Sequence, residues 1–415
     1  MEYIISIFLD TRRPKENGCY PLKLRVYSTQ LKIKKLYALR HEMTKAKFQS
    51  VWESQKPRKE NQEVRNELQA VITRANDVCK TLEPFSFIQF EKKYLRNTGD
   101  GGNVIYQYQQ MINKLKSNNS FSTASNYEMS LNSLKKFILL TTGSEPLKIT
   151  FVNITPDWLQ RYENYMISNL KRSRTTVSMY LRALRTVFNK AIADKEISLE
   201  LYPFGKDKYQ TPGLIGVKKA LSKEHLKQLS EAEPKTLEQT KAKDFWFFSY
   251  ACNGMNIKDI ALLKYKNIQE GKIIFYRAKT INTSKKDLRP ITVYLNDYSN
   301  SIIKKYGNKN TNKEEYIFPI ISAKETELVN HTKIKNFTKF INQNLKKLAI
   351  SEGITGEIST YWARHSYATM ALIKGKQIEF VGEAFGHRDM KTTQGYFAGF
   401  EDEVKKEFSQ GLMNF

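Results

Sequence analysis

Cysteine is scarce in this sequence. Its 415 residues include three cysteines, which lie far apart and form no Cys-x-x-Cys pair: Cys19, Cys79 and Cys252. This spacing argues against a disulfide framework and a zinc knuckle, and it fits a reducing cytosol. The sequence also has no carboxylate cluster and no set of histidine and cysteine ligands, so we expect neither a metal nor a cofactor.

Long apolar runs are missing as well. The run near the start, Tyr3 to Leu9, has seven residues and follows Glu2 instead of a basic segment. No run approaches the roughly 20 residues that a membrane span needs. We therefore expect a cytoplasmic protein that is neither exported nor embedded in a membrane. The sequence shows no internal repeat and no low-complexity segment.

Acidic residues are few relative to basic ones. The chain has 68 lysines and arginines against 42 aspartates and glutamates, a formal net charge of +26, and the basic residues are spread from end to end. A positive field of this size suits a polyanion, and a composition that is 40% hydrophobic and 12% aromatic is that of a folded protein. Nucleic acid is therefore the first partner to consider, which would place the protein at the nucleoid. The alternative is a basic protein that binds no nucleic acid.

The length favours several modules, because a chain of this size exceeds a single core. Residues 1–85 hold three short alternating runs and then a helix from about Gln62 to Leu82, which predicts a small antiparallel sheet with a trailing helix. Such a sheet can lay basic strands into a DNA groove, although a solvated basic face is the alternative. The outward positions of the sheet carry Lys23, Arg25, Lys32, Lys34 and Lys35, of which Lys32 and Lys34 are our candidates for DNA binding.

A second, helical module is expected over residues 100–205, after a glycine-rich break. One helix has Ser122 or Thr123 as its predicted N-cap, and another follows Thr155-Pro156. The twenty residues from Lys171 to Lys190 contain six basic residues and no acidic one, so the outer face of this helix is a predicted phosphate or groove surface. A solvated helix face is again the alternative. The candidates for DNA contact are Arg172, Arg174, Arg182 and Arg185.

The third module, residues 215–415, follows a linker rich in proline and glycine. Ser222 is placed as the N-cap of its first helix, and two later helices meet at the break Asn253-Gly254. The expected fold class is mainly α with small β-sheets, an α+β arrangement. The further predicted elements are a hairpin formed by 271–280 and 288–295, and helices that contain 341–348, 365–373 and 378–385.

The third module also carries side chains suited to phosphodiester chemistry. Tyr396 follows the polar stretch Thr392 to Gly395, which predicts a loop running into a short helix with the tyrosine hydroxyl presented to a substrate. The planar fork of Arg364 can bind two phosphate oxygens, and Lys279 can protonate a leaving oxygen. Together with His387, these groups can attack a phosphodiester without a metal.

These residues stand in a recognisable order. The stretches "ARHSYAT", "FGHRDMKTTQGY" and "NGMNIKDIALLK" resemble the motifs of the tyrosine recombinase (phage integrase) family, especially those of conjugative-transposon integrases. The resemblance covers nearly the whole chain. It implies an arm-type DNA-binding module at 1–85, a helical, SAM-like core-binding domain at 100–205, and a catalytic domain at 215–415.

The resemblance also implies roles for individual residues. Tyr396 would be the nucleophile that joins to a DNA 3′ phosphate and releases a 5′ hydroxyl. Arg364 and His387 would bind the non-bridging oxygens of that phosphate, and Lys279 would protonate the leaving oxygen. Lys285 and Lys286 lie in the same loop and compete with Lys279 for the last role.

The family resemblance implies a metal- and ATP-independent DNA strand transferase that acts on double-stranded DNA for integration, excision or inversion. Its C-terminal tail, with Val404, Phe408 and Leu412 at helical spacing, would dock into a neighbouring protomer and give a homotetramer on DNA. Accessory DNA-bending or directionality proteins would be further partners.

Two positions depart from the family pattern. Tyr361 stands where a histidine commonly lies three residues before Arg364, and its hydroxyl can still bind a phosphate oxygen. Asn256 stands where the family usually has its first active-site arginine, so a charge-assisted contact worth a few kcal/mol is missing. We expect a nearby cation to replace it, and the candidates are Lys258, Lys285 and Arg388. His365, beside Arg364, is expected to support the site without reacting.

Two alternatives use the same fold. The first is a catalytically weak or inactive DNA-binding accessory protein, which Asn256 motivates. The second is an enzyme similar to a type IB topoisomerase, which shares the tyrosine chemistry but does not need the arm-like first module. Binding without a covalent adduct would favour the accessory protein, and relaxation of a supercoiled plasmid without strand exchange would favour the topoisomerase.

Overall fold

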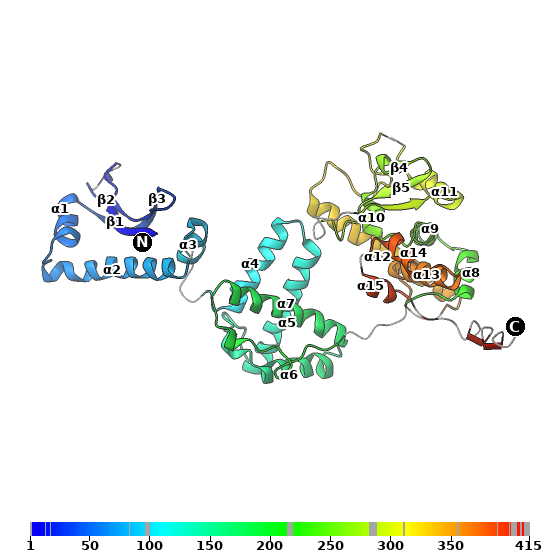
Figure 1. Ribbon diagram of the computed structural model, residues 1–415, viewed down its shortest axis with the longest axis horizontal. Coiled ribbons are helices and arrows are strands. Elements are labelled where there is room, and N and C mark those ends of the chain that lie inside the picture. The colour runs from blue at the N-terminus through cyan, green and yellow to red at the C-terminus, as the bar shows by residue number, and fades with distance from the viewer. Residues whose placement is uncertain are drawn as a thin grey trace. The chain divides into compact units, whose positions relative to one another are not determined.

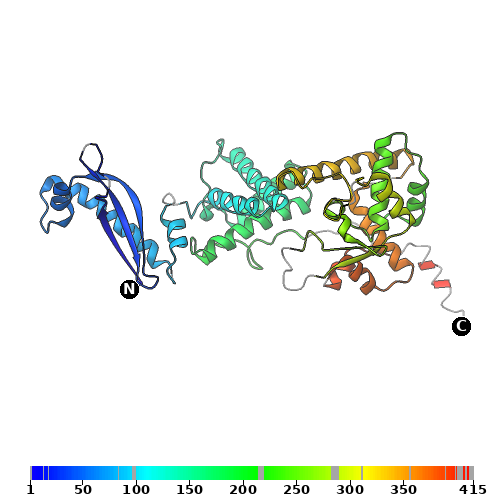
Figure 2. The same ribbon diagram turned by 90° about the horizontal axis from the view of Figure 1, so that it is seen from above.

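The computed structural model describes the chain except residues 1, 13, 17, 83, 96–99, 214–218, 282–288, 310–311, 355–356, 388, 398, 400–404, 407–408 and 411–415, and except the side chain of residue 92. The contacts within the chain divide it into two compact units, whose helices and strands are drawn in Figures 1 and 2. The first unit comprises residues 1–114 and 122–213, and the second comprises 115–121 and 214–415. The division of the first unit into an arm-type module and a core-binding domain stays a prediction.

The first unit begins with a three-stranded antiparallel sheet in the order β1-β2-β3, as expected (Figure 1). Leu22, Leu24 and Val26 alternate along the middle strand, are fully buried, and pack in one core with the helix that follows the sheet. Lys34 is exposed on a strand, whereas Lys32 lies in the preceding turn with a positive φ of 53°. The elements are β1 (Tyr3–Leu9), β2 (Tyr20–Ser28), β3 (Ile33–Met43), α1 (Lys45–Phe48), the π-helical turn Gln49–Glu53, α2 (Lys59–Lys80) and α3 (Phe87–Tyr94).

The rest of the first unit is helical. Thr155 caps α6 and Ser173 caps α7, because each hydroxyl accepts a hydrogen bond from the backbone N–H three residues on. The predicted N-cap of α5 was wrong: α4 ends at Ser117, the following turn contains the left-handed residue Asn119, and α5 has already begun at Phe121. The elements are α4 (Val104–Ser117), α5 (Phe121–Thr142), α6 (Pro156–Asn164), α7 (Arg174–Ala193), the 3-10 turns Phe151–Asn153 and Leu199–Leu201, and the π-helical turn Tyr165–Asn169.

The second unit confirms the expected α+β class, with a small antiparallel sheet in the order β4-β5-β6 beside helices. Ser222 caps the first helix as predicted, and Trp246 on α9 is fully buried in the core. None of the helices in the described part of the chain is long and apolar enough to cross a membrane. The elements are α8 (Lys223–Glu231), α9 (Leu237–Ala251), α10 (Ile257–Leu262), the 3-10 turn Tyr265–Asn267, β4 (Ile268–Gln269), β5 (Lys272–Phe275), β6 (Ile291–Tyr294), α11 (Asp297–Tyr306), α12 (Glu327–Ser351), α13 (Thr360–Ile373), α14 (Ile378–Phe385) and α15 (Met390–Gln394).

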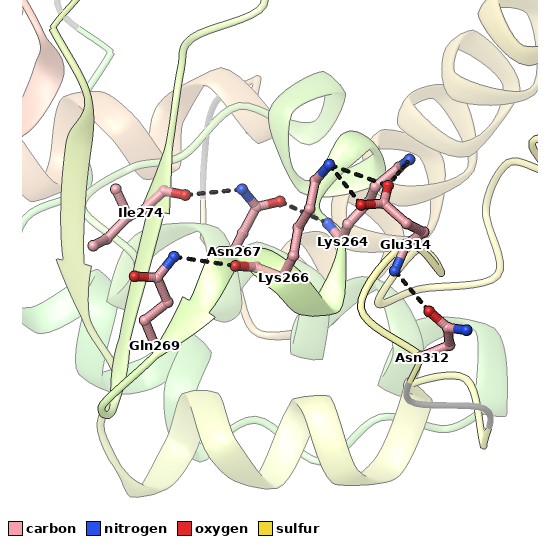
Figure 3. Close-up of polar contacts among 7 residues, drawn as sticks. All are labelled: Lys264, Lys266, Asn267, Gln269, Ile274, Asn312 and Glu314. Atoms are coloured by element: carbon pink, nitrogen blue, oxygen red, sulfur yellow. Dashed lines mark hydrogen bonds and ion pairs between the residues drawn. The ribbon is translucent and has the colours of Figure 1, made fainter.

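A polar cluster holds the base of this sheet in place (Figure 3). The Asn267 amide donates to the carbonyl oxygen of Ile274 on β5 at 2.9 Å and accepts from the backbone N–H of Lys264 at 2.9 Å. Glu314 forms ion pairs with Lys264 and Lys266 at 3.1 and 2.9 Å, which lower the pKa of its carboxyl group. These exposed ion pairs add little stability alone. The amide bonds, however, define where strand β5 runs and hence where the residues after it leave the sheet.

Candidate active site

Helix α13 supplies one face of the candidate site. Tyr361, Arg364 and His365 are separated by three residues and then one, so they lie on neighbouring positions of the same helical face. Arg364 is 3% exposed, and its guanidinium group donates to the carbonyl oxygens of Gly254 at 3.2 Å and Phe385 at 3.3 Å. The guanidinium carbon also lies 3.6 Å from the centroid of the Phe385 ring. Arg364 is therefore held rigidly before any substrate arrives.

The Asn253-Gly254 break makes room for that arginine. Gly254 has a positive φ of 61°, and a Cβ atom there would lie 2.5 Å from the Cα atom of Arg364. A side chain at this position would therefore meet both backbone strain and a steric clash. The turn after α9 has this sequence because α13 passes directly over it.

The segment after α14 positions His387. Gly386 follows α14 in the left-handed conformation, with φ of 64°. The backbone N–H of His387 donates a hydrogen bond to the carbonyl oxygen of Gly382. The Nε2 atom of His387 lies 3.4 Å from a nitrogen of Arg364, and its Nδ1 atom lies 3.0 Å from the Thr393 hydroxyl. An arginine can only donate, so Nε2 accepts and Nδ1 carries the hydrogen. Burial, reinforced by nearby positive charges, lowers the pKa of His387 to about 4.

Tyr396 follows the short helix α15 and is buried. The predicted loop at Thr392 to Gly395 was wrong, because Met390–Gln394 form the helix and Tyr396 comes after it. The Tyr396 side chain is only 8% exposed and packs on Phe385 and His365 with ring centroids 5.1 and 4.8 Å away. The carbonyl oxygen of Tyr396 accepts a hydrogen bond from Nδ1 of His365 at 3.1 Å. The phenol oxygen in turn accepts one from the Tyr361 hydroxyl at 3.1 Å.

This environment favours the ionised form of Tyr396. Burial alone would raise the pKa of the phenol, but the hydrogen bond from Tyr361 and the charges of Arg364 and Arg277 outweigh it, so the pKa lies below its ordinary value. The pKa of Tyr361 is raised, by burial and by its bond to Tyr396, which keeps it as the donor of the pair. Arg364 remains a cation at neutral pH, although burial and then the charge of Arg277 lower its pKa to about 10.

Arg277 is the residue that the sequence reasoning missed. It lies just after β5, is 9% exposed, and carries a positive charge that helps to lower the pKa of Tyr396. Its signal in the sequence is the alternation of strand β5: Ile273 and Phe275 point inward, and Arg277 continues that register. A charged side chain at an inward-facing position is unfavourable unless it has a partner or a function, so this arginine is a candidate site residue.

Each of the two arginines has a hydrogen-bond donor that no protein group in the described part of the chain accepts. The buried Nε atoms of Arg277 and Arg364 have no hydrogen-bond partner. Unpaired buried donors are costly, so their presence on two neighbouring cations is typical of an anion site. Two guanidinium groups beside a phenol of lowered pKa can hold a phosphate while the phenol attacks it.

Asn256 does not take part in this cluster directly. Its amide donates to the buried carboxylate of Asp259 at 3.5 Å, and that carboxylate also accepts from the backbone N–H of Ala278 at 2.9 Å. Burial raises the pKa of Asp259, and the bond to Ala278 and the charge of Arg277 partly offset this shift. The pair thus ties α10 to the segment that carries Arg277, and it is a second feature that sequence reasoning missed.

The other predicted residues are distributed as follows. Lys279 is exposed, and its charge contributes to the lowered pKa of His387, so it lies near the cluster. Lys258 is exposed, and its charge acts on His331 instead. The remaining DNA-binding candidates, all in the first unit, are exposed: Arg172, Arg174, Arg182, Arg185, Lys32 and Lys34. Arg388, the loop lysines Lys285 and Lys286, and the tail residues Val404, Phe408 and Leu412 lie outside the described residues.

Comparisons with known proteins place these features in context. Residues 103–210 match the model of the phage integrase SAM-like domain, and residues 219–402 match the model of the phage integrase family. The matches cover helices α4 to α7 of the first unit and the whole cluster around Tyr396.

Individual proteins agree with these models. The tyrosine recombinase XerD of Rickettsia bellii is 24% identical over 271 residues, which are 62% of this chain and 84% of that protein. Transposase A from transposon Tn554 of Staphylococcus aureus is 26% identical over 148 residues, 35% of this chain and 36% of that protein. The Tn1549 transposon integrase, solved in complex with transposon right end DNA, shares the fold with a TM-score of 0.52, at 15% identity and over 75% of this chain and 99% of that one.

Proposed function

Because the chain belongs to the phage integrase family of tyrosine recombinases, we propose that it cleaves and rejoins double-stranded DNA at specific sites through a covalent bond between Tyr396 and a 3′ phosphate. The observation that carries the proposal is the phenol of lowered pKa beside two buried arginines with unpaired Nε atoms. The same observation supports the assignment of Arg277 to the place that Asn256 leaves without a cation.

In the cleavage step, the Tyr396 oxygen attacks the phosphorus atom of the scissile phosphate. The new O–P bond forms as the bond to the 5′ oxygen breaks, and the phenol proton passes to water. Arg364 and Arg277 bind the non-bridging oxygens, whose charge grows in the transition state. Lys279 protonates the leaving 5′ oxygen. The low pKa of His387 describes the free protein, and a bound phosphate would raise it and favour an additional hydrogen bond.

Resealing is the reverse reaction with a different strand. The 5′ hydroxyl of the partner strand attacks the phosphotyrosine, and Tyr396 is the leaving group. The phosphotyrosine keeps the energy of the original phosphodiester, so neither ATP nor a metal is required in this scheme. Integration, excision and inversion all use these two steps.

Assembly on DNA completes the proposal. A net charge of +26 and the one-sided charge of residues 171–190 support binding to a DNA backbone. Exchange of the C-terminal tail between protomers, a homotetramer, and accessory DNA-bending or directionality proteins follow from the family resemblance.

The test begins by selecting a binding site from random duplexes with the full chain. The selected duplex is then nicked near the scissile position, incubated in EDTA with wild type or with Tyr396→Phe, and read on a denaturing gel for a protein–DNA adduct. We expect an adduct with wild type and none with the variant. If both proteins bind and neither forms an adduct at several nick positions, the accessory-protein alternative replaces this one. Relaxation of supercoiled plasmid without exchange would indicate a topoisomerase.

A further inference from the structure

A hollow lies in the first unit, between helix α7 and the segment 204–213, and its volume is about 480 Å³. Ser178, Arg182 and Arg185 line it from α7, and their spacing of four and then three residues puts them on one face of the helix. Lys206 and Thr211 line it from the other side. Every residue in the lining belongs to the described part of the same compact unit.

Two hydroxyl groups in this lining have no partner. The Oγ atom of Ser178, a fully buried residue, and the Oγ1 atom of Thr211 are both buried and make no hydrogen bond. Among the described residues five buried side-chain atoms are unpaired in this way, and two of the other three are the Nε atoms of Arg277 and Arg364. The hollow therefore shares with the candidate active site a pair of polar groups without a protein partner, which points to a polar ligand.

The charge of the lining indicates an anion. Among the described residues, no acidic side chain lines the hollow, whereas Arg182, Arg185 and Lys206 do. Arg185 is held by a bond from its Nε atom to the Tyr202 hydroxyl at 2.8 Å. Arg182 and Lys206 are exposed and form no ion pair or side-chain hydrogen bond within the described chain, so their charges are available to a ligand.

The wall formed by the 204–213 segment is preorganised. Tyr209 exchanges backbone hydrogen bonds with Pro203 at 3.0 Å and Gly205 at 3.1 Å, and its buried hydroxyl donates to Glu163 at 2.6 Å. These bonds hold Lys206 and Thr211 opposite α7 before any ligand binds. A preformed site loses less conformational entropy on binding than a mobile one.

We propose that this hollow binds one backbone phosphate of the DNA substrate, an inference that rests on the proposed function. Arg182 and Lys206 neutralise the phosphate, and the hydroxyl groups of Ser178 and Thr211 donate to its oxygens. Contacts to phosphate fix the register of a protein on a duplex without reading bases. The hollow therefore sets how the helical domain sits on the strand, while Tyr396 performs the chemistry elsewhere.

The test measures equilibrium binding by fluorescence anisotropy at a series of salt concentrations. All proteins are full-length and carry Tyr396→Phe, so that binding stays reversible, and the probe is the selected duplex. Arg182→Gln and Lys206→Gln should each weaken binding on the order of tenfold, whereas the salt slope should change little because the remaining cation still neutralises the phosphate. The double variant leaves the phosphate without a cation and should reduce the slope by about 0.9. Arg161→Gln removes an exposed charge on α6, outside the hollow, and its effect should simply add to that of Arg182→Gln.

Ser178→Ala separates binding from folding. It removes an unpaired buried hydroxyl, so the free protein should melt at the same or a higher temperature while its affinity for DNA falls severalfold. A hydroxyl with a merely structural role would lower the melting temperature without changing the salt slope. Thr211→Val should behave as Ser178→Ala does.

Two results would overturn the assignment. The first is wild-type affinity in both Arg182→Gln and Lys206→Gln. The second is a slope change of about 1.8 in the double variant, which two separate phosphate contacts would give. Adduct formation by wild type distinguishes these failures from failure of the proposed function, because it depends on Tyr396 and not on this hollow.

Discussion

Replacing Arg277 tests whether it supplies the cation that Asn256 does not. In the free protein its charge sits beside the buried Arg364 and helps to lower the pKa of that guanidinium to about 10. Removing one of two buried like charges relieves repulsion, so Arg277→Gln should leave the Tm unchanged or raise it. In the transition state, in contrast, the variant lacks a preorganised hydrogen-bond donor to the phosphate. Loss of one such donor typically slows a reaction by about 10²- to 10³-fold, or roughly 2.7–4 kcal/mol.

The assay is single-turnover cleavage of the nicked duplex at saturating protein, so that changes in DNA affinity do not enter. Arg277→Lys keeps the charge without the planar fork and should fall between wild type and Arg277→Gln. Lys258→Gln is the matched control, because Lys258 was an expected substitute but is exposed and acts on His331. We expect the control to stay within about twofold of wild type. A cleavage rate for Arg277→Gln within about threefold of wild type would refute the assignment.

Further predictions concern the surroundings of the nucleophile. Tyr361→Phe removes the donor to the Tyr396 oxygen, so the pKa of Tyr396 should rise and the cleavage-rate profile should shift to higher pH; an unshifted profile would contradict the role of that bond. Gly254→Ala should destabilise the protein by about 2–4 kcal/mol in urea unfolding, because its Cβ atom would clash with Arg364 at a positive φ, and a loss below about 0.5 kcal/mol would be inconsistent with the geometry. His365→Ala should slow cleavage because the Tyr396 carbonyl loses its donor, and His365→Asn should recover part of the rate with an unchanged pH profile; equal rates in the two variants would exclude this positioning role.

Local patterns in the sequence were sufficient for much of the second unit. Helix α14 contains the predicted residues, and it ends at Phe385 because the following glycine adopts the left-handed conformation. The alternation of apolar residues predicted the hairpin of β5 and β6. Ser222 was predicted as the N-cap of α8 from its position before the helix. The start of α5 was not, because a left-handed Asn119 lets the helix begin before the hydroxyl residues that looked like its cap.

The candidate site has features that local sequence patterns could not predict. The motifs give Arg364, His387 and Tyr396, but the role of Arg277 depends on how the end of β5 packs against α13, which are far apart in the sequence. The burial of Tyr396 likewise depends on Phe385 and His365 from two other elements. Contacts between distant elements follow from packing, and no residue periodicity encodes them.

The most direct test of the central claim is to locate the DNA on the protein. The adduct formed by wild type is treated with nuclease and trypsin, and the peptides are analysed by mass spectrometry for a residual nucleotide. Tyr396 lies in the tryptic peptide 392–405, whereas Tyr361, whose hydroxyl is only 3.1 Å away, lies in 348–364. Modification of Tyr396 in the first peptide is the predicted result, and a nucleotide on Tyr361 or on any other residue would contradict the account.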